Sequence, residues 1–318
     1  MGLAETGPQT LETSYLKPMR CIFCKCDSTS SCSVEHIIPE SAGNKKRVLP
    51  AGVVCDKCNN YFARRVEQPV LTHSWMRNVR AWEQVSNKKG TYPSLIGHIA
   101  GTDIAVNMRR SAGGMFHLNT EKGNDKSALS EVVINEFERP LIFTINDDPP
   151  QREMSRFLCK MAYEAVAELF CESPQGPYHL SNEPFFGNVR EYARYGNNFK
   201  EWPFSQRRVF PHDTLMQHPL TNEWVQAGFG FGLFMNRRQE TLFCFLFYGV
   251  EFVINVGGPS ISGYNEWINE HAGISPMVER LGCRLAQGED RKHYLHGSFE
   301  ISKGLEFDKK HGYCPFLP

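Results

Sequence analysis

The sequence predicts an α+β protein in which a small N-terminal domain precedes a larger domain with antiparallel strands. Near the N-terminus, two Cys-x-x-Cys pairs enclose short apolar strings separated by turn residues. From about residue 92 onward, segments rich in Ile, Val and Phe alternate with glycine turns, which is typical of strands. Residues 147–172 have the apolar spacing of a long amphipathic helix. Strand and helix patterns thus occur in one chain, and this combination predicts the α+β class.

The composition limits the possible functions. With 41% apolar and 12% aromatic residues, the chain can bury a sizeable core. The formal net charge is zero, which gives no support to a protein that coats nucleic acid through bulk charge. Residues 1–92 hold 13 Lys and Arg against 8 Asp and Glu, so the basic excess belongs to the segment with the cysteine pairs. Any contact with nucleic acid must therefore be a local patch.

The cysteines and the N-terminus predict a cytoplasmic protein with reduced thiols and no membrane association. Residues 1–17 lack the charged and apolar regions of a signal peptide, and we expect them to form a disordered leader. The start "MGLAET" fits a loose myristoylation pattern, but that pattern is short. The most apolar run, "LFCFLFYGVEFVINVGG", is interrupted by Gly249 and Glu251 and is too short to cross a membrane.

We expect residues 18–88 to form the first domain, with two short strands followed by two helices. The strings "VEHIIP" and "GVVC" are typical of strands, and the polar loop "ESAGNKKRVLPA" joins them. The segment "DKCNNYFARRVEQPVL" is typical of a helix that Pro69 interrupts near its end. In "LTHSWMRNVRAWEQV", Trp75, Val79 and Trp82 have helical spacing and predict one apolar face.

The two cysteine pairs predict a structural zinc site. Cys21, Cys24, Cys55 and Cys58 can place four thiolates around one Zn²⁺ at about 2.3 Å. The domain that they close has only about forty residues, a size at which a core rarely holds itself together without a metal.

Three alternatives stay open at these cysteines, and the first is that the two pairs are unrelated and share no metal. Second, Cys26 or Cys32, which lie nearby, could replace one of the four expected ligands. A thiol-redox site is the third alternative, but a redox Cys-x-x-Cys normally occurs once, before a helix in a βαβ unit, and that pattern is missing.

A Glu-His pair, Glu35 and His36, lies between the cysteine pairs, and Asn59 follows the second pair. The order Cys-x-x-Cys, Glu-His-Ile-Ile-Pro, a glycine-containing loop and Cys-x-x-Cys-Asn resembles the HNH endonucleases, the ββα-metal (His-Me finger) nucleases. The resemblance covers roughly residues 18–70. It implies that His36 is the general base of DNA hydrolysis, and that Glu35 and Asn59 hold one catalytic divalent metal, Mg²⁺ or Mn²⁺.

These residue types suit the chemistry that the resemblance implies. A neutral His, with a pKa near 6.5, can take a proton from water at pH 7, and carboxylate and amide oxygens suit a hard cation. The sequence departs from the family pattern in three places. The carboxylate is Glu35 rather than Asp, Asn59 stands where His is usual, and the middle Asn has no clear counterpart because Asn44 sits early.

Five basic residues predict contact with the phosphates of double-stranded DNA. They are Lys45, Lys46 and Arg47 in the loop, and Arg64 and Arg65 on the helix after the second cysteine pair. A solvated charge cluster is the alternative for such runs. RNA is the alternative substrate, because no residue recognisably reads the 2′-hydroxyl.

Residues 89–318 are expected to form an α+β specificity or regulatory domain, as one unit or as two subdomains. Strand patterns cover residues 92–120, 131–147 and 226–258, with "NRRQ" as a turn in the last of them, and residues 188–196 predict a short helix.

No motif in this second region carries chemistry. By analogy with nucleases fused to non-basic domains, we expect it to direct or regulate cleavage, in restriction or anti-phage defence. An activating protein or ligand and a homo-oligomer are both compatible with this reading. The alternative for the whole chain is a zinc-stabilised module that binds nucleic acid or protein and has an inactive nuclease centre.

Overall fold

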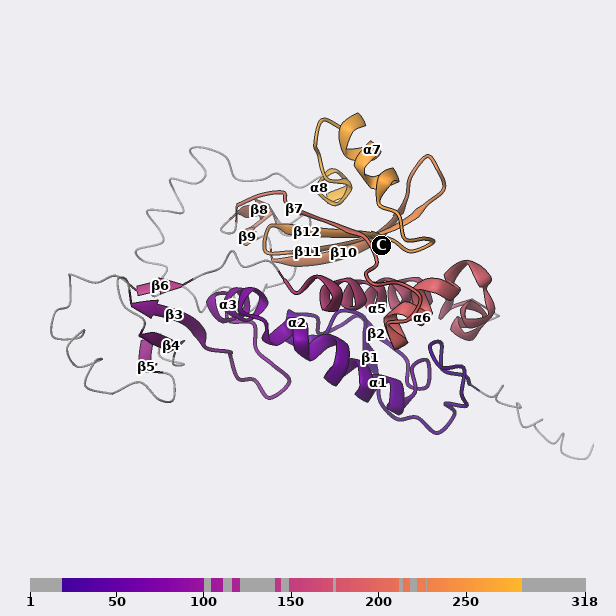
Figure 1. The fold of residues 1–318 in the computed structure, drawn as a ribbon, viewed down its shortest axis with the longest axis horizontal. Coiled ribbons are helices and arrows are strands. Elements are labelled where there is room, and N and C mark those ends of the chain that lie inside the picture. Colours follow the sequence, from indigo (N-terminus) through magenta and orange to yellow (C-terminus); the bar gives the residue numbers. More distant parts are fainter. Residues whose placement is uncertain are drawn as a thin grey trace, which may run out of the picture.

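The computed structural model consists of an N-terminal module, a long central helix and two four-stranded antiparallel sheets (Figure 1). We define the N-terminal module as residues 19–88. The structure describes residues 19–99, 104–110, 116–120, 141–143, 149–173, 176–211, 214–217, 222–226 and 228–281. The predicted leader lies outside the described residues. The α+β class predicted from the sequence is confirmed.

The N-terminal module contains a two-stranded sheet and a helical segment. Its elements are β1 (Glu35–His36), the short 3-10 helix η1 (Glu40–Ala42), β2 (Val48–Leu49), α1 (Asp56–Phe62), the π-helical turn η2 (Ala63–Glu67), α2 (Gln68–Thr72) and α3 (Ser74–Trp82). Strands β1 and β2 are antiparallel, with Glu35 opposite Leu49 and His36 opposite Val48. Two short strands followed by helices therefore form, as the sequence predicts.

Three details of the module differ from the prediction. The second strand is Val48–Leu49 and not residues 52–55, because the register of β1 pairs its two residues with Leu49 and Val48. Pro69 does not end the helix: it stands in the first turn of α2, where a missing N–H costs no intrahelical bond. Trp82 is 53% exposed, whereas Trp75 and Val79 of the same predicted face are buried.

The first large sheet follows the module. It consists of β3 (Leu95–Ile99), β4 (Ala105–Arg110), β5 (Phe116–Thr120) and β6 (Leu141–Phe143), in the spatial order β5-β4-β3-β6. These strands confirm the strand patterns over residues 92–120 and part of the pattern over 131–147. The rest of that second pattern lies outside the described residues.

The remaining elements form the second large sheet or connect to it. They are α5 (Gln151–Phe170), the 3-10 helices η3 (Pro177–Asn182) and η4 (Pro184–Phe186), α6 (Gly187–Tyr195), β7 (Phe204–Arg208), β8 (Leu215–Gln217), β9 (Trp224–Gln226), β10 (Phe229–Met235), β11 (Thr241–Phe247), β12 (Val250–Asn255), α7 (Ser262–Glu270) and α8 (Pro276–Leu281). The sheet order is β10-β11-β12-β7, and β8 pairs with β9. In the part of the chain that the structure describes, no helix is both long and apolar enough to cross a bilayer.

Helix α5 lies between the N-terminal module and the second sheet (Figure 1), and it joins their apolar cores into one. Phe23 of the module packs edge to face against Tyr163 of α5, with ring centroids 5.2 Å apart. On its other side α5 packs Phe157 against Phe245 of β11. Trp75 of α3 reaches the same sheet directly, 5.5 Å from Phe252. The core therefore crosses the domain boundary that the sequence predicts at residue 88.

Candidate active site

The four predicted zinc ligands come together at one point of the module. The Sγ atoms of Cys21, Cys24, Cys55 and Cys58 all lie within 4.8 Å of one another. The Cys24 and Cys55 sulfurs are 3.6 Å apart, close to the ~3.8 Å edge of a tetrahedron with 2.3 Å Zn–S bonds. These residues fit a zinc ion by donor type and spacing.

The other cysteines of this region do not join the cluster. Cys26 and Cys32 are exposed, and neither belongs to the group of thiols that could hold a metal. Inside the cluster, the hydrogen bond from the Cys58 side chain lowers the pKa of Cys21 to about 5, although burial opposes this. A thiolate is the form that binds zinc.

Residues outside the module support the second cysteine pair. Arg194 of α6 donates from Nε to Cys58 Sγ at 3.2 Å, and its guanidinium lies 3.8 Å from the centroid of the Tyr61 ring. A cation that donates to a metal-binding thiolate offsets part of its charge and fixes its orientation. The metal centre thus has a polar contact from the C-terminal part of the chain.

Strand β1 presents its two residues to opposite sides. Glu35 is 4% exposed and pairs with buried Leu49, whereas His36 is partly exposed and pairs with exposed Val48. Because side chains alternate along a strand, Val34 lies on the same outer face as His36. The candidate base therefore faces solvent, and the adjacent carboxylate faces the interior.

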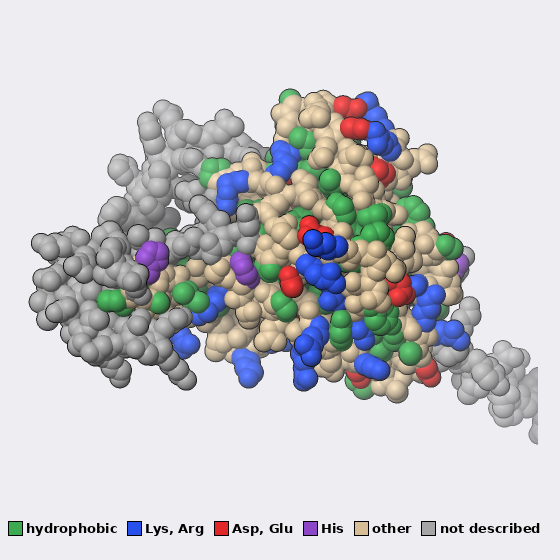
Figure 2. Space-filling model, viewed as in Figure 1, with side chains coloured by type: hydrophobic (Ala, Val, Ile, Leu, Met, Phe, Trp, Pro, Cys, Tyr) green, Lys and Arg blue, Asp and Glu red, His purple; other side chains and the backbone are tan. Residues whose placement is uncertain are grey.

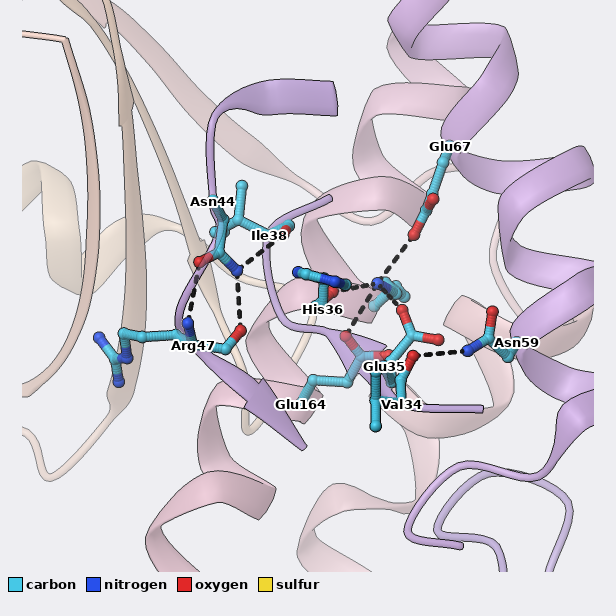
Figure 3. A network of polar contacts seen from close by, with 10 residues as sticks. Val34, Glu35, His36, Ile38, Asn44, Arg47, Asn59, Glu67 and Glu164 are labelled. Atoms are coloured by element: carbon cyan, nitrogen blue, oxygen red, sulfur yellow. Dashed lines mark hydrogen bonds and ion pairs between the residues drawn. The ribbon is translucent and has the colours of Figure 1, made fainter. Parts of the chain in front are cut away.

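The interior partner of Glu35 is Lys160, which is fully buried in α5. Lys160 Nζ donates to Glu35 Oε1 at 2.6 Å and to the His36 carbonyl at 3.0 Å. It also pairs with Glu67 Oε1 at 2.8 Å and with Glu164 Oε2 at 2.9 Å. Figure 3 shows these contacts converging beside β1. Reading the sequence alone missed Lys160, Glu67 and Glu164.

The charges of this network are unbalanced. Burial disfavours the charge of Lys160, but the carboxylates of Glu164, Glu35 and Glu67 outweigh it and raise the lysine pKa well above its usual value. Burial also raises the pKa values of Glu164 and Glu35, against the attraction of Lys160. Three carboxyl groups thus share one buried ammonium.

His36 is set up to be neutral at pH 7. Burial lowers its pKa below the ordinary value, and the positive charge of Lys88 adds to this effect. Its Nδ1 atom is buried and has no hydrogen-bond partner among the described residues. A neutral imidazole can accept a proton, so the environment favours the form that a general base needs.

Asn44 holds the loop between β1 and β2. Its Nδ2 donates to the carbonyls of Ile38 and Arg47, each at 2.8 Å, and its Oδ1 accepts from the backbone N–H of Arg47 at 3.0 Å (Figure 3). The same Oδ1 also accepts from the backbone N–H of Lys46 at 3.2 Å. Asn44 is 1% exposed. Asn44 thus makes the loop-holding contacts for which the sequence offered no clear residue, and its early position is explained because β2 also starts early.

Asn59 connects α1 to the strand that carries the Glu-His pair. Its Nδ2 donates to the Val34 carbonyl at 3.1 Å (Figure 3). The amide oxygen then remains as the ligand-type atom of this residue. Glu35 Oε2 is a buried carboxylate oxygen with no hydrogen-bond partner among the described residues.

Glu35 Oε2 and the Asn59 amide oxygen are the two ligand atoms that the sequence resemblance implies for a hard cation. Carboxylate and amide oxygens are the ligand types that Mg²⁺ and Mn²⁺ prefer, and Mg²⁺ usually keeps several waters. Apart from the four thiols, the described residues contain no group of three His, Cys, Asp or Glu side chains close enough to hold a metal. Glu35 and Asn59 fit such a cation by donor type, with few protein ligands.

The basic residues predicted to contact DNA differ in their exposure and contacts. Lys45, Lys46, Arg64 and Arg65 are exposed, and Lys and Arg side chains occur along the lower edge of the molecule in Figure 2, where Figure 1 places α1 and α2. Arg47 instead turns toward the C-terminal part of the chain. Its guanidinium pairs with Glu168 of α5 and lies 4.0 Å from the ring centroid of Phe231.

Comparison with known proteins agrees with this geometry. Residues 21–74 match a family model described as HNH endonuclease. The resemblance read from the sequence is confirmed over this segment, which is of the HNH endonuclease class and carries the four-cysteine cluster. No curated protein and no solved structure significantly matches the chain. The match ends before α3 is complete, so it describes the N-terminal module alone.

Proposed function

We propose that this protein is a metal-dependent endonuclease that hydrolyses phosphodiester bonds of double-stranded DNA. The observation that carries the proposal is the outward-facing His36 on β1, within the segment that matches the HNH endonucleases. Asn44 on one side and Asn59 on the other support the backbone around it.

In this proposal His36 takes the proton of a water molecule in line with the leaving oxygen. Its lowered pKa keeps the imidazole neutral at pH 7, and its partly exposed position gives it access to the substrate. Glu35 and Asn59 would hold the divalent metal, Mg²⁺ or Mn²⁺. When bound, such a metal offsets the charge that develops on the phosphate and the leaving oxygen.

The exposed side chains Lys45, Lys46, Arg64 and Arg65 would contact the DNA backbone. Such contacts do not depend on sequence, so they would set affinity and its salt dependence rather than a recognition site. Because Arg47 is already paired with Glu168 of α5, we expect it to contribute less to phosphate binding than the four exposed basic residues do.

Cleavage of supercoiled plasmid in Mg²⁺ or Mn²⁺ tests the proposal, with His36→Ala as the decisive variant. We expect nicking by the wild-type protein, none in the presence of a chelator, and a loss of at least about 10²-fold in the variant, the usual contribution of a general base. Zinc content and melting temperature of the variant should match the wild type. If the wild-type protein cleaves no plasmid with any divalent metal, the proposal that it is an endonuclease is wrong.

A second candidate function is a zinc-stabilised module that binds nucleic acid or protein and has an inactive nuclease centre. The observation that favours it is the ion pair between Glu35 and Lys160, because the ammonium takes one of the two carboxylate oxygens. The plasmid assay separates the two candidates, and DNA binding without cleavage would support the second.

For the rest of the chain we propose a role in directing or regulating cleavage, in restriction or anti-phage defence in the cytoplasm. Support comes from the shared apolar core, in which α5 packs against both the module and the second sheet. An activating protein or ligand would act through this core. Competition between DNA and RNA substrates, and cleavage of plain against modified DNA, test the specificity.

A further inference from the structure

The contact between Lys160 and β1 joins segments that are far apart in the sequence. Lys160 lies 125 residues after Glu35, near the middle of α5, and its side chain has no exposed surface. Its partners come from β1, from the π-helical turn η2, which ends at Glu67, and from the next turn of α5 at Glu164. A π-helical turn inside a helix often marks a functional site, because it changes which residues face inward.

A packing role does not explain a lysine at this position. Helix α5 is otherwise buried mainly through apolar side chains, and a methionine of similar length would fill the same space. Burying a charge costs several kcal/mol before its partners compensate for it. The Lys160 ammonium is surrounded by three carboxylates and a backbone carbonyl. This arrangement indicates that Lys160 holds these groups in position, rather than only filling space in the core.

The imidazole of His36 has little else to hold it. Its Nδ1 atom has no hydrogen-bond partner among the described residues, so the orientation of the ring depends on the backbone of β1. That strand has only two residues, and two-stranded ribbons are weak on their own. Lys160 bonds to the backbone carbonyl of His36 and to the side chain of Glu35, on the face opposite the imidazole.

We propose that Lys160 is a positioning residue of the nuclease centre, which holds Glu35 and the His36 carbonyl from the interior so that the His36 imidazole faces the substrate. The catalytic part of this inference rests on the proposed function. Glu67 and Glu164 fix the ammonium. Helix α5 is then a part of the active centre, although it lies outside the segment that matches the nuclease family.

The first test is Lys160→Met with Arg156→Met as a matched control. Arg156 lies one turn earlier in α5 and donates to the Tyr61 hydroxyl and to the carbonyls of Ala193 and Arg194, and among the described residues no bond joins it to β1. We expect Lys160→Met to lower the single-turnover cleavage rate about 10²-fold, the loss that a displacement of about 1 Å can cause. DNA affinity should stay within about twofold. Arg156→Met should keep the wild-type rate.

A double variant separates positioning from general damage. If Lys160 acts through His36, adding Lys160→Met to His36→Ala should cause no further loss of rate, because the two changes remove the same contribution. A further tenfold loss in the double variant would show that Lys160 acts by another route and would overturn the inference.

A second readout does not need activity. In histidine-labelled protein, the ring signal of His36 is the one absent from the NMR spectrum of His36→Ala. We expect this signal to shift or broaden in Lys160→Met and to stay unchanged in Arg156→Met. An unchanged signal in Lys160→Met overturns the inference. If the wild type cleaves nothing, the proposed function fails, and this comparison still decides the role of Lys160.

A folding defect of Lys160→Met is covered by a further variant. Lys160→Met with Glu164→Gln restores the net charge of the network, so its folding and zinc content should approach those of the wild type. We expect this double variant to keep the low cleavage rate and the changed His36 signal, since the ammonium is still missing. Cleavage at the wild-type rate by this protein would overturn the inference.

Discussion

The loop between β1 and β2 is held by one buried side chain, Asn44. Its amide donates to the Ile38 and Arg47 carbonyls and accepts from two backbone N–H groups. Gly43, just before it, has a φ of 106°, a left-handed conformation that favours glycine. These two residues together close the loop and place β2 beside the Glu-His pair.

Asn44→Asp is a sharp test of this role, because it keeps the shape and removes the donor. The buried Ile38 carbonyl and the partly buried Arg47 carbonyl lose their donor and face a carboxylate, so we expect a loss of about 2–3 kcal/mol in the free energy of unfolding. Cleavage should fall as well. Urea denaturation measures the first effect, with Asn60→Asp on the exposed side of α1 as the control. Equal stability of the two variants would contradict the prediction.

At the same scale, much of the site could be predicted from the sequence, because its residues are close together in it. The alternation of Glu35 and His36 follows from the period of a strand, and the cysteine spacing fixes four ligands. Lys160 could not be placed, because nothing local indicates which strand a residue 125 positions away will contact. The available signal was a Lys-Glu pair four residues apart, Lys160 and Glu164, in an otherwise apolar helix.

Among the secondary-structure elements, strand β12 and helix α7 are joined by a buried carboxyl group. Glu251 of β12 is fully buried and accepts hydrogen bonds from Tyr264 of α7 and from Ser275. Burial raises its pKa, while the bonds from Ser275 and Tyr264 and the charge of Arg207 oppose that effect. The folded protein therefore holds this proton more tightly than the unfolded chain does.

A pH-dependent contribution to stability follows from Glu251. A carboxyl with a raised folded pKa contributes stability below its unfolded pKa, and this is lost as the pH rises through the folded value. We expect the wild type to lose stability relative to Glu251→Gln between about pH 4.5 and the folded pKa. Urea denaturation of both proteins at several pH values measures the difference. A constant difference across this range would contradict the prediction.

The helices and strands were predicted well from the sequence where an apolar pattern repeats over many residues. They were predicted poorly where the pairing between strands decides which residues form the strand. Helix α5 and the strands β10 to β12 have long periodic patterns, and the turn at "NRRQ" falls between β10 and β11 as expected. The second strand of the module was placed four residues too late, because "GVVC" is more apolar than "RVL". The antiparallel register with β1 decides between them, and that register is a tertiary contact.

The molecule as a whole is organised around α5. The helix contributes buried residues to one core that includes Phe23 and Phe62 of the module and Phe245 of the second sheet. The described residues of the β3–β6 sheet contribute nothing to that core. The N-terminal module and the second sheet therefore share an apolar core, whereas the first sheet meets the module through polar contacts such as those of Asn78 with Ile96.

Two deletions test this organisation. Residues 18–88 alone should not fold cooperatively even with zinc, because they expose the surface that α5 covers. A chain without residues 92–147, joined by a flexible linker, should keep its zinc and a cooperative thermal transition. Circular dichroism and zinc analysis measure both. A cooperatively folded 18–88 fragment would contradict the shared core and would restore the boundary predicted from the sequence.

The position of Lys160 also has a consequence for synthesis. A ribosome adds about 5–20 residues per second, so the Glu-His strand is made roughly 6–25 s before the lysine that lies behind it. By then the four cysteines of the zinc site have also been made. If Lys160 positions the strand, as we propose, the Glu-His strand lacks its interior support until α5 has emerged, so the order of the segments along the chain delays completion of the proposed nuclease centre.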